Sequence, residues 1–380
     1  FGRLNLQVGE AYDLRQALSE FGATREADAT AQNAGILQLA YRIVHEIAML
    51  SPVTPTGLVS TALLLTGEQR VHRDTVIALV HWLTPRLRAH NATFTRALVA
   101  PTAAKGEQEP EADLLDVRED ALDQALSRLV GEKAIRLEAD APAPLYDLVE
   151  DRRVSLGYYR NGIINFLVAE SVVARAVLAT EAEEPGRIDT AVVRRRARFL
   201  SRVWKYEFVF KVGDSFDDIF DATLDRLAGR SVDRDGEELR IVEAGRADLE
   251  LSALLLQDYF EAYRIAVITL TALLDGPIGR KALVRRMRDD AIKAHSQGEL
   301  VRRESSNRIT FDNAVAALLD LGVVEETVGR KRHGTPVALT PGYHDGIELT
   351  RLLDRLNRLR FQDHPSATYD PAAAREAPEA

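Results

Sequence analysis

The fold class is decided by one stretch, Asn161-Gly-Ile-Ile-Asn-Phe-Leu-Val-Ala-Glu-Ser-Val-Val-Ala-Arg-Ala-Val-Leu-Ala-Thr180, which is apolar on nearly every side. A helix that is apolar all round is buried among other elements. The stretch therefore predicts a central helix that other helices surround. Apolar residues also recur at helical spacing in the flanking sequence, over residues 13–21, 36–50, 56–65, 73–88, 119–130, 189–210, 216–227 and 249–274.

Two further regions end in pairs of short strand candidates. Helices followed by two strands around a turn are typical of a small winged-helix-like α+β unit, and the turn residues mark the hairpins. The strand candidates are Ile135–Glu138 and Leu145–Val149 in the first region, and Val323–Thr327 and Val337–Leu339 around the basic turn 329–334 in the second. Helices are predicted before the second pair over residues 281–299 and 310–321, and after it over 343–361. The sequence thus predicts a mainly α fold with small α+β units.

Composition excludes several classes of function. The 380 residues carry a net charge of −9 and no cysteine. An acidic chain lacks the basic surface of a dedicated nucleic-acid binder, and a chain without cysteine has no disulfide, thiolate zinc site or cysteine nucleophile. No run of 18 uncharged apolar residues occurs, so we expect no membrane-spanning helix. The histidines show no metal-binding spacing, and we expect neither a metal nor a cofactor.

Five short strings stand out because helical periodicity does not require them. They are Phe1-Gly-Arg-Leu-Asn-Leu-Gln-Val-Gly-Glu10, Pro52-Val-Thr-Pro-Thr-Gly-Leu-Val-Ser60, Tyr158-Tyr-Arg-Asn161, Lys205-Tyr-Glu-Phe208 and Phe260-Glu-Ala-Tyr263. In this order, the strings resemble the C-terminal region of the membrane-associated glycerol-3-phosphate acyltransferases of bacteria, a family related to mitochondrial and peroxisomal enzymes. The resemblance covers residues 1 to about 274, and beyond that point it is vague.

The resemblance implies transfer of a fatty acyl group from acyl-CoA or acyl carrier protein to the 1-hydroxyl of glycerol 3-phosphate. In that family the chemistry belongs to an upstream α/β domain, in which a His acts as general base and an Asp five positions later orients it. The residues five positions after the eight histidines of this chain are Leu50, Ile77, Arg86, Thr95, Leu300, Ala338, Leu349 and Tyr369, so none is Asp. No catalytic residue is therefore assigned to this chain, which alone is expected to be inactive.

On this interpretation the chain starts with the end of the upstream domain, including its last strand over Leu4–Val8. The expected division is residues 1–33 for that end and a linker (22–33), 34–150 for a first helical, winged-helix-like unit, 151–275 for a central helical unit, 276–362 for a second winged-helix-like unit and the final helix, and 363–380 for a disordered tail. Residues 105–116 and 229–245 are expected to be surface loops.

Tyr159, Arg160 and Asn161 are the first candidate site, because they lie just before the most apolar stretch. The structural interpretation is a helix start in which Asn161 caps and Arg160 pairs with a carboxylate. In the functional interpretation, Arg160 faces the upstream domain or a CoA phosphate. Both interpretations stay open at the level of sequence.

A basic helix supplies the second candidate site. Arg194, Arg195, Arg198, Arg202 and Trp204 could dock on an anionic membrane surface, and Arg302 is among the arginines that could extend that surface. The structural alternative is a solvated face above a core stripe.

We therefore predict an accessory part of a glycerol-3-phosphate acyltransferase, which packs on the upstream catalytic domain at the cytoplasmic face of the membrane. Its expected partners are that domain, the acyl donor and anionic lipid, with no nucleic acid. The alternative is a non-catalytic winged-helix binding or regulatory protein.

Overall fold

The computed structural model describes residues 6–24, 26–99, 117–327 and 334–360. The predicted acidic loop over 105–116, most of the basic turn 329–334 and the predicted tail over 363–380 lie outside these ranges. The described chain is mainly helical, with three small antiparallel sheets. The predicted mainly α class with small α+β parts is confirmed.

The helices and strands repeat one order three times: helix, short strand, helix, helix and a two-stranded hairpin. The first unit contains α3 (Pro55–Leu65), β1 (Arg70–His72), α4 (Arg73–Ala89), α5 (Glu119–Gly131), β2 (Ile135–Leu137) and β3 (Leu145–Leu148). The last strand, β3, pairs with both others, so the sheet order is β1-β3-β2. Val71 lies opposite Tyr146 in this sheet, and both side chains are buried.

The second and third units have the same order and the same sheet pairing. The second contains α7 (Val168–Glu183), β4 (Ile188–Asp189), α8 (Thr190–Val203), α9 (Phe216–Leu227), β5 (Val232–Asp235) and β6 (Glu238–Ile241). The third contains α11 (Gln257–Thr269), β7 (Ile278–Gly279), α12 (Arg280–Ser296), α13 (Arg308–Asp320), β8 (Val324–Glu326) and β9 (Pro336–Leu339). Their sheet orders are β4-β6-β5 and β7-β9-β8. The winged-helix-like interpretation of such units stays a prediction.

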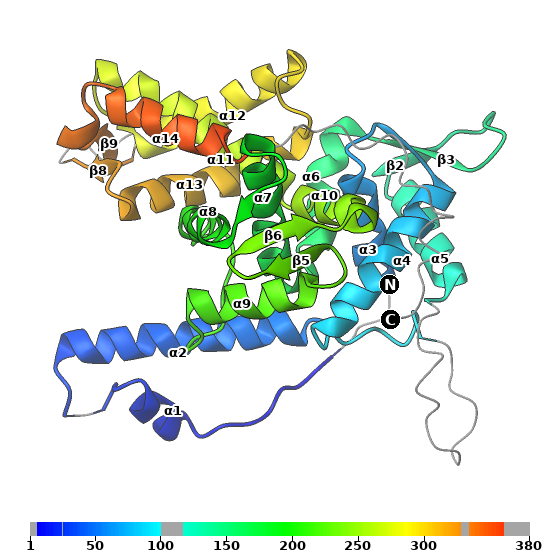
Figure 1. Ribbon diagram of the computed structural model, residues 1–380, viewed down its shortest axis with the longest axis horizontal. Helices are drawn as coiled ribbons and strands as arrows, with labels where there is room; N and C mark the ends of the chain where they lie inside the picture. The colour runs from blue at the N-terminus through cyan, green and yellow to red at the C-terminus, as the bar shows by residue number, and fades with distance from the viewer. Residues whose placement is uncertain (1–5, 25, 100–116, 328–333, 361–380) are drawn as a thin grey trace.

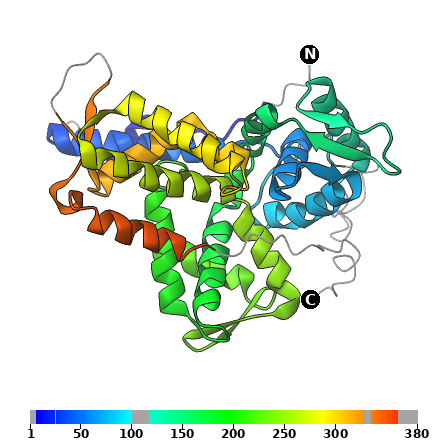
Figure 2. The ribbon, with the colours of Figure 1, turned by 90° about the horizontal axis from the view of Figure 1, so that it is seen from above.

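The remaining helices connect or flank the three units. They are α1 (Leu14–Glu20), α2 (Ala29–Leu50), α6 (Arg153–Arg160), α10 (Arg246–Leu254) and α14 (Ile347–Asn357). Figure 1 shows the second unit between the other two, with the first on the right and the third at the upper left. The same view shows α2 below the second unit, with α1 beneath α2. In the perpendicular view of Figure 2, the first unit again lies on the right and the third at the upper left.

Local sequence explains where several helices begin. Short polar side chains accept hydrogen bonds from the free backbone N–H groups of the first turn. Asp13, Asp28, Thr54, Asp189 and Asn307 cap α1, α2, α3, α8 and α13 in this way. Ser215 and Asp218 form a reciprocal capping box at the start of α9.

The predicted central helix is present, but it begins later than expected. Residues 161–167 form a turn and a short 3-10 segment, and α7 begins at Val168. Nearly every residue of α7 up to Thr180 is buried, against α8, α9 and α10. Gly162 disfavours an earlier helical start because glycine loses more backbone entropy in a helix than other residues.

Four other predicted boundaries are wrong. The helix predicted over 249–274 is broken into α10, α11 and a 3-10 segment, and the helix over 189–210 ends at Val203. The predicted linker 22–33 is shorter, because α2 starts at Ala29. The predicted strand Leu4–Val8 is not formed by its described residues 6–8, where Leu6 and Val8 are exposed.

Candidate functional site

Three of the five strings meet in one buried cluster, although they are far apart in the sequence. The buried polar cluster, as we call it, contains Arg160 from the end of α6, Phe208 after α8, and Asp258, Tyr259 and Tyr263 from α11. The exposed Asn161 and the half-buried Glu207 lie at its edge. The ring of Phe208 meets the ring of Tyr259 edge-on, with centroids 5.1 Å apart. The hydroxyl of Tyr259 donates to Asn161 Oδ1 at 3.3 Å.

Arg160 and Asp258 form the central ion pair of this cluster. Two parallel hydrogen bonds join them, Nη1 to Oδ1 at 2.9 Å and Nη2 to Oδ2 at 2.8 Å. Burial, the largest influence, lowers the pKa of Arg160, but the charge of Asp258, the charges of Tyr259 and Glu304 and the hydrogen bonds to Asp258 together outweigh burial and raise it. The guanidinium also lies 5.3 Å from the centre of the Tyr259 ring. Arg160 is 5% exposed and pairs with a carboxylate, as the structural interpretation of the residue states. The helix start in that interpretation is wrong, because α6 ends at Arg160 and Asn161 is its C-terminal cap.

Glu207 is a half-buried carboxylate that accepts hydrogen bonds from neutral groups. The Tyr263 hydroxyl donates to its Oε1 at 2.9 Å, and the Asn313 amide donates to its Oε2 at 3.1 Å. Burial raises the pKa of Glu207 to about 7, and the two hydrogen bonds offset only part of that effect. The pair Glu207–Tyr263 joins the second unit to the third.

The third string also borders a second feature of the molecule, an open cleft. Parts of the first, second and third strings line an open cleft of about 1120 Å³ on the first unit. Thr54 caps α3 at the edge of this cleft, and Val53 pairs with the strand-like segment beside it, through Val53 N–Thr93 O at 2.7 Å. The lining residues include Leu6, Gln7, Pro52, Thr54, Pro55, Thr56, Thr93, Thr95, Arg96, Arg128 and Tyr159.

The cleft offers hydroxyl groups and two guanidinium groups. Thr95 is 6% exposed, and its Oγ1 has no hydrogen-bond partner within the described ranges. Arg128 is paired with Glu132 at 2.8 Å, whereas Arg96 is exposed. The Tyr159 hydroxyl donates to the second oxygen of Glu132 at 3.0 Å. Of the predicted site residues, Tyr159 is therefore the one that borders the cleft.

A second set of buried charges joins the first unit and α6 to the third unit, and sequence reasoning missed it. Arg153 pairs with Glu304 at 2.9 Å, and both are buried. Arg302 is 3% exposed and donates to the backbone carbonyls of Leu64 and Leu65 at the end of α3. The expectation that Arg302 extends a membrane-docking surface is therefore wrong, because its guanidinium group is buried and bonded to backbone carbonyls inside the protein.

A third set of charges joins the first unit to the second. Arg86 on α4 pairs with Glu170 on α7 and with Asp248 on α10. Arg230 contacts the same two carboxylates, at 3.0 and 3.1 Å. Buried ions are costly unless they are paired, so these sets fix how the units meet.

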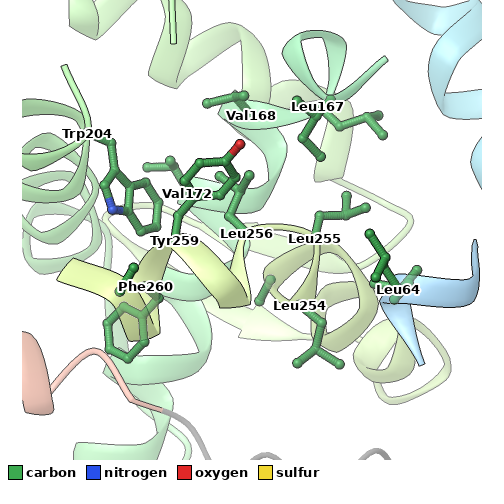
Figure 3. Packing of buried hydrophobic residues seen from close by; sticks show 14 of the residues in the cluster. Leu64, Leu167, Val168, Val172, Trp204, Leu254, Leu255, Leu256, Tyr259 and Phe260 are labelled. Carbon is green, nitrogen blue, oxygen red and sulfur yellow. The ribbon is translucent and has the colours of Figure 1, made fainter. Parts of the chain in front are cut away.

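The predicted basic helix α8 carries its arginines in two different environments. Arg194 and Arg198 pair with Asp217 on α9, and Arg194 also pairs with Asp221. Arg195 and Arg202 are exposed. Trp204 is 1% exposed, and Figure 3 shows its ring packed beside Tyr259 and Val172. Its predicted place on a surface is wrong, because it follows the last turn of α8 into the core.

The buried polar cluster connects α6, the segment after α8, and α11. The side chains of the buried polar cluster bond mainly to one another, which leaves them little capacity for a substrate. Within the described ranges, no three His, Asp or Glu side chains come together as a metal site would require. None of the helices described is both long and apolar enough to cross a bilayer.

Comparison with known proteins agrees with the resemblance of the strings. Residues 1–327 match the family described as the glycerol-3-phosphate acyltransferase C-terminal region. Acyltransferase plsB1 of Mycobacterium tuberculosis H37Rv is 27% identical over 312 residues, which is 80% of this chain and 46% of that protein. The dihydroxyacetone phosphate acyltransferase of Oryctolagus cuniculus is 26% identical over 168 residues, which is 44% of this chain and 24% of that protein.

The chain spans less than half the length of these curated relatives. The match to the family covers most of the sequence, and it includes all five strings and the three units up to β8. The chain therefore belongs to the family of glycerol-3-phosphate acyltransferase C-terminal regions.

Proposed function

We propose that this chain is the accessory part of a glycerol-3-phosphate 1-O-acyltransferase. The complete enzyme would transfer an acyl group from acyl-CoA or acyl carrier protein to glycerol 3-phosphate, the first step of phospholipid synthesis. The catalytic His and Asp would come from the N-terminal part of the longer protein, which we call the acyltransferase part. This chain would bind that part and hold it in an active form.

One observation carries the proposal: the strings that mark the family lie where helices of different units pack together and along one cleft. Arg160 joins α6 to α11, and Glu207 joins the segment after α8 to α11. A group that reacts with a substrate has to reach it, within about 2.6–3.2 Å for proton transfer. Buried, mutually bonded side chains instead support a rigid surface on which another domain can be positioned.

The cleft is the proposed place for contact with the acyl donor or its carrier. Coenzyme A and acyl carrier protein are both anionic, and Arg96 is an exposed cation on the lining of the cleft. Guanidinium groups bind phosphates through several hydrogen bonds. We also propose a peripheral position at the cytoplasmic face of the membrane, with Arg195 and Arg202 of α8 as the contacts for anionic lipid.

The test is release of CoA from palmitoyl-CoA in the presence of glycerol 3-phosphate, read with a thiol reagent. This chain adds no background because it contains no cysteine. We expect no turnover by this chain alone and more turnover by the acyltransferase part when this chain is added. Turnover by this chain alone, or no effect of adding it, would contradict the accessory role.

The second candidate is a binding or regulatory protein built from winged-helix-like modules. The threefold repeat of helix, strand, helix, helix and hairpin favours it. A salt-dependent shift of duplex DNA by the purified chain would support this candidate, because phosphate contacts weaken as salt rises. We expect no shift, since the net charge is −9.

A further inference from the structure

Helix α2 turns its apolar side away from the protein. Most of the large apolar side chains between Ile36 and Ile47 are at least one-third exposed, although such residues normally face a core. Since consecutive residues are about 100° apart around a helix, they cover roughly half of its circumference. This surface, which we call the α2 apolar face, consists of Ile36, Leu37, Tyr41, Ile43, Val44 and Ile47, which are 53%, 55%, 43%, 36%, 49% and 61% exposed.

The polar side of the same helix faces the protein. Arg42 bonds to Glu20 of α1 at 3.1 Å and to Glu46 at 2.9 Å. His45 Nδ1 lies 3.2 Å from the carbonyl oxygen of Val209. Gly35 and Leu39 are the residues of α2 that are fully buried. The helix is thus attached through Arg42, His45, the buried Leu39 and, near its end, Met49, which packs against the core, while its wide apolar face remains exposed.

A surface of this kind marks an interface, because soluble proteins rarely expose large contiguous apolar patches. An anionic membrane is a poor fit to it. Interfacial helices that bind such membranes carry several Lys or Arg on their polar side, whereas the one basic residue of α2, apart from His45, is Arg42, which is already paired. A folded protein surface is the better fit.

Two observations identify the occupant. The matching family is a C-terminal region, and more than half of the length of its mycobacterial relative lies outside the match. The face is also continuous with the segment that leads into the chain. An added Cβ at Gly9 would lie 2.7 Å from Leu50 at the end of α2, and the neighbouring Leu6 and Val8 are 82% and 87% exposed.

We propose that the α2 apolar face is the docking surface for the acyltransferase part of the longer protein. This inference rests on the proposed function and locates the contact that the function requires. The face would give this contact its hydrophobic centre, and Arg42, Glu46 and Glu20 would lie at its polar edge. Such an apolar centre with a polar rim is the usual anatomy of a stable protein interface.

The test uses single cysteines, because the chain has none of its own. Ile47→Cys reports on the face, and Ile309→Cys on α13 is the matched control, since these residues are 61% and 68% exposed. Each variant is treated with a maleimide under three conditions. The variant is present by itself, together with the separately purified acyltransferase part, or together with phosphatidylglycerol vesicles. Labelling is followed at the substituted site by peptide mass spectrometry.

We expect the acyltransferase part to slow labelling of Ile47→Cys at least tenfold and to leave Ile309→Cys unchanged. Vesicles should slow neither. A second pair of variants tests affinity: Ile47→Glu should weaken the complex at least about tenfold, because a buried isoleucine contributes enough to binding for that loss, whereas Ile309→Glu should not.

The outcomes separate this inference from the proposed function. If the complex forms and Ile47→Cys stays reactive, the docking surface is elsewhere and the accessory role survives. If the wild-type parts form no complex in gel filtration, both the accessory role and this inference fail. Protection by vesicles would assign the face to lipid, and protection that rises with the concentration of the chain alone would assign it to a second copy; either result overturns the inference.

Discussion

Arg160 and Asp258 are separated by 98 residues and joined by two hydrogen bonds of 2.9 and 2.8 Å inside the protein. Arg160 belongs to the helix that follows the first unit, and Asp258 belongs to the first turn of α11 in the third. A bidentate pair fixes both the distance and the angle between its partners. The pair therefore sets how these two parts of the chain meet.

Removal of one partner of this pair should be strongly destabilising. Arg160→Met leaves Asp258 buried without its cation, which should lower the free energy of unfolding by about 3–5 kcal/mol. The double variant Arg160→Met/Asp258→Leu should lose much less, because no unpaired charge remains. Urea unfolding followed by circular dichroism measures both effects.

The matched control for that experiment is Arg198→Met. Arg198 also pairs with a carboxylate, Asp217, but the two side chains are 43% and 50% exposed. Exposed pairs contribute about 0–1 kcal/mol. Equal losses for Arg160→Met and Arg198→Met would show that burial of the Arg160 pair does not matter for stability.

Glu207 should make stability depend on pH. Its pKa is raised by burial from 4.5 to about 7, so the folded state binds the proton more tightly than the unfolded state does. This contribution is complete below pH 4.5, is lost as the pH rises towards 7, and is absent above it. Each pKa unit corresponds to about 1.4 kcal/mol, so the loss from this residue is on the order of 3 kcal/mol.

Glu207→Gln tests that dependence, because a neutral amide does not titrate. The urea midpoint of the wild type should fall between pH 5 and pH 8 by more than that of the variant. The amide oxygen can still accept a hydrogen bond from Tyr263 or Asn313, so the variant should fold. Parallel curves for the two proteins across this range would exclude Glu207 as the titrating group.

The sequence predicted most helices because their apolar residues follow the helical period. The predicted helix over 216–227 coincides with α9, and the hairpin strands around residues 135–149 and 323–339 are present with shifts of about a residue. The first strands of the units were missed. β4 and β7 contain two residues each, and a strand that short has no alternation to detect.

The hairpin β5–β6 was also missed, although a signal was available. It was predicted as part of a surface loop because its strands are short and highly charged. Asp235 pairs with Glu238, so Gly236 and Glu237 form the two-residue turn, and Gly236 has a φ of 62°. A glycine that starts a two-residue turn is a hairpin signal. Recognition of that turn would have revealed the second unit and hence the threefold repeat.

The candidate site was less predictable than the fold. The sequence identified Arg160, but its partner Asp258 could not be named, because the pairing depends on how α6 and α11 pack. The burial of Arg302 and Trp204 has the same cause. Whether an arginine faces solvent or a set of backbone carbonyls depends on tertiary contacts. The periodicity of the sequence within one helix gives no information about those contacts.

Two helical glycines should respond to alanine in opposite ways. An added Cβ at Gly35 of α2 would lie 2.5 Å from the carbonyl oxygen of Phe21, whereas one at Gly131 of α5 would meet nothing within 4 Å. Gly131→Ala should stabilise the protein by about 0.5–1 kcal/mol, because alanine loses less backbone entropy in a helix. Gly35→Ala should push α1 away from α2.

The effect of Gly35→Ala is local, so a local measurement is required. Cleavage by trypsin at Arg15 in α1 should become faster in this variant, because the detached helix opens more often. Gly131→Ala should leave that cleavage rate unchanged while it raises the urea midpoint. If Arg15 is cut at the wild-type rate in Gly35→Ala, the contact between α1 and α2 is not close in solution.

If α8 contacts the membrane, substitution of its exposed arginines and substitution of the carboxylates on α9 should change vesicle binding in opposite directions. Arg195→Glu/Arg202→Glu removes two exposed cations and should weaken binding to phosphatidylglycerol vesicles at least tenfold, since each cation near an anionic surface contributes about 1 kcal/mol. Asp217→Asn/Asp221→Asn should strengthen binding, because Arg194 and Arg198 lose the carboxylates that pair with them. Vesicle co-sedimentation at two salt concentrations measures both changes, because screening by salt should reduce them together. If binding is insensitive to all four substitutions, the lipid contact does not involve α8, and Arg194 and Arg198 serve to hold α9.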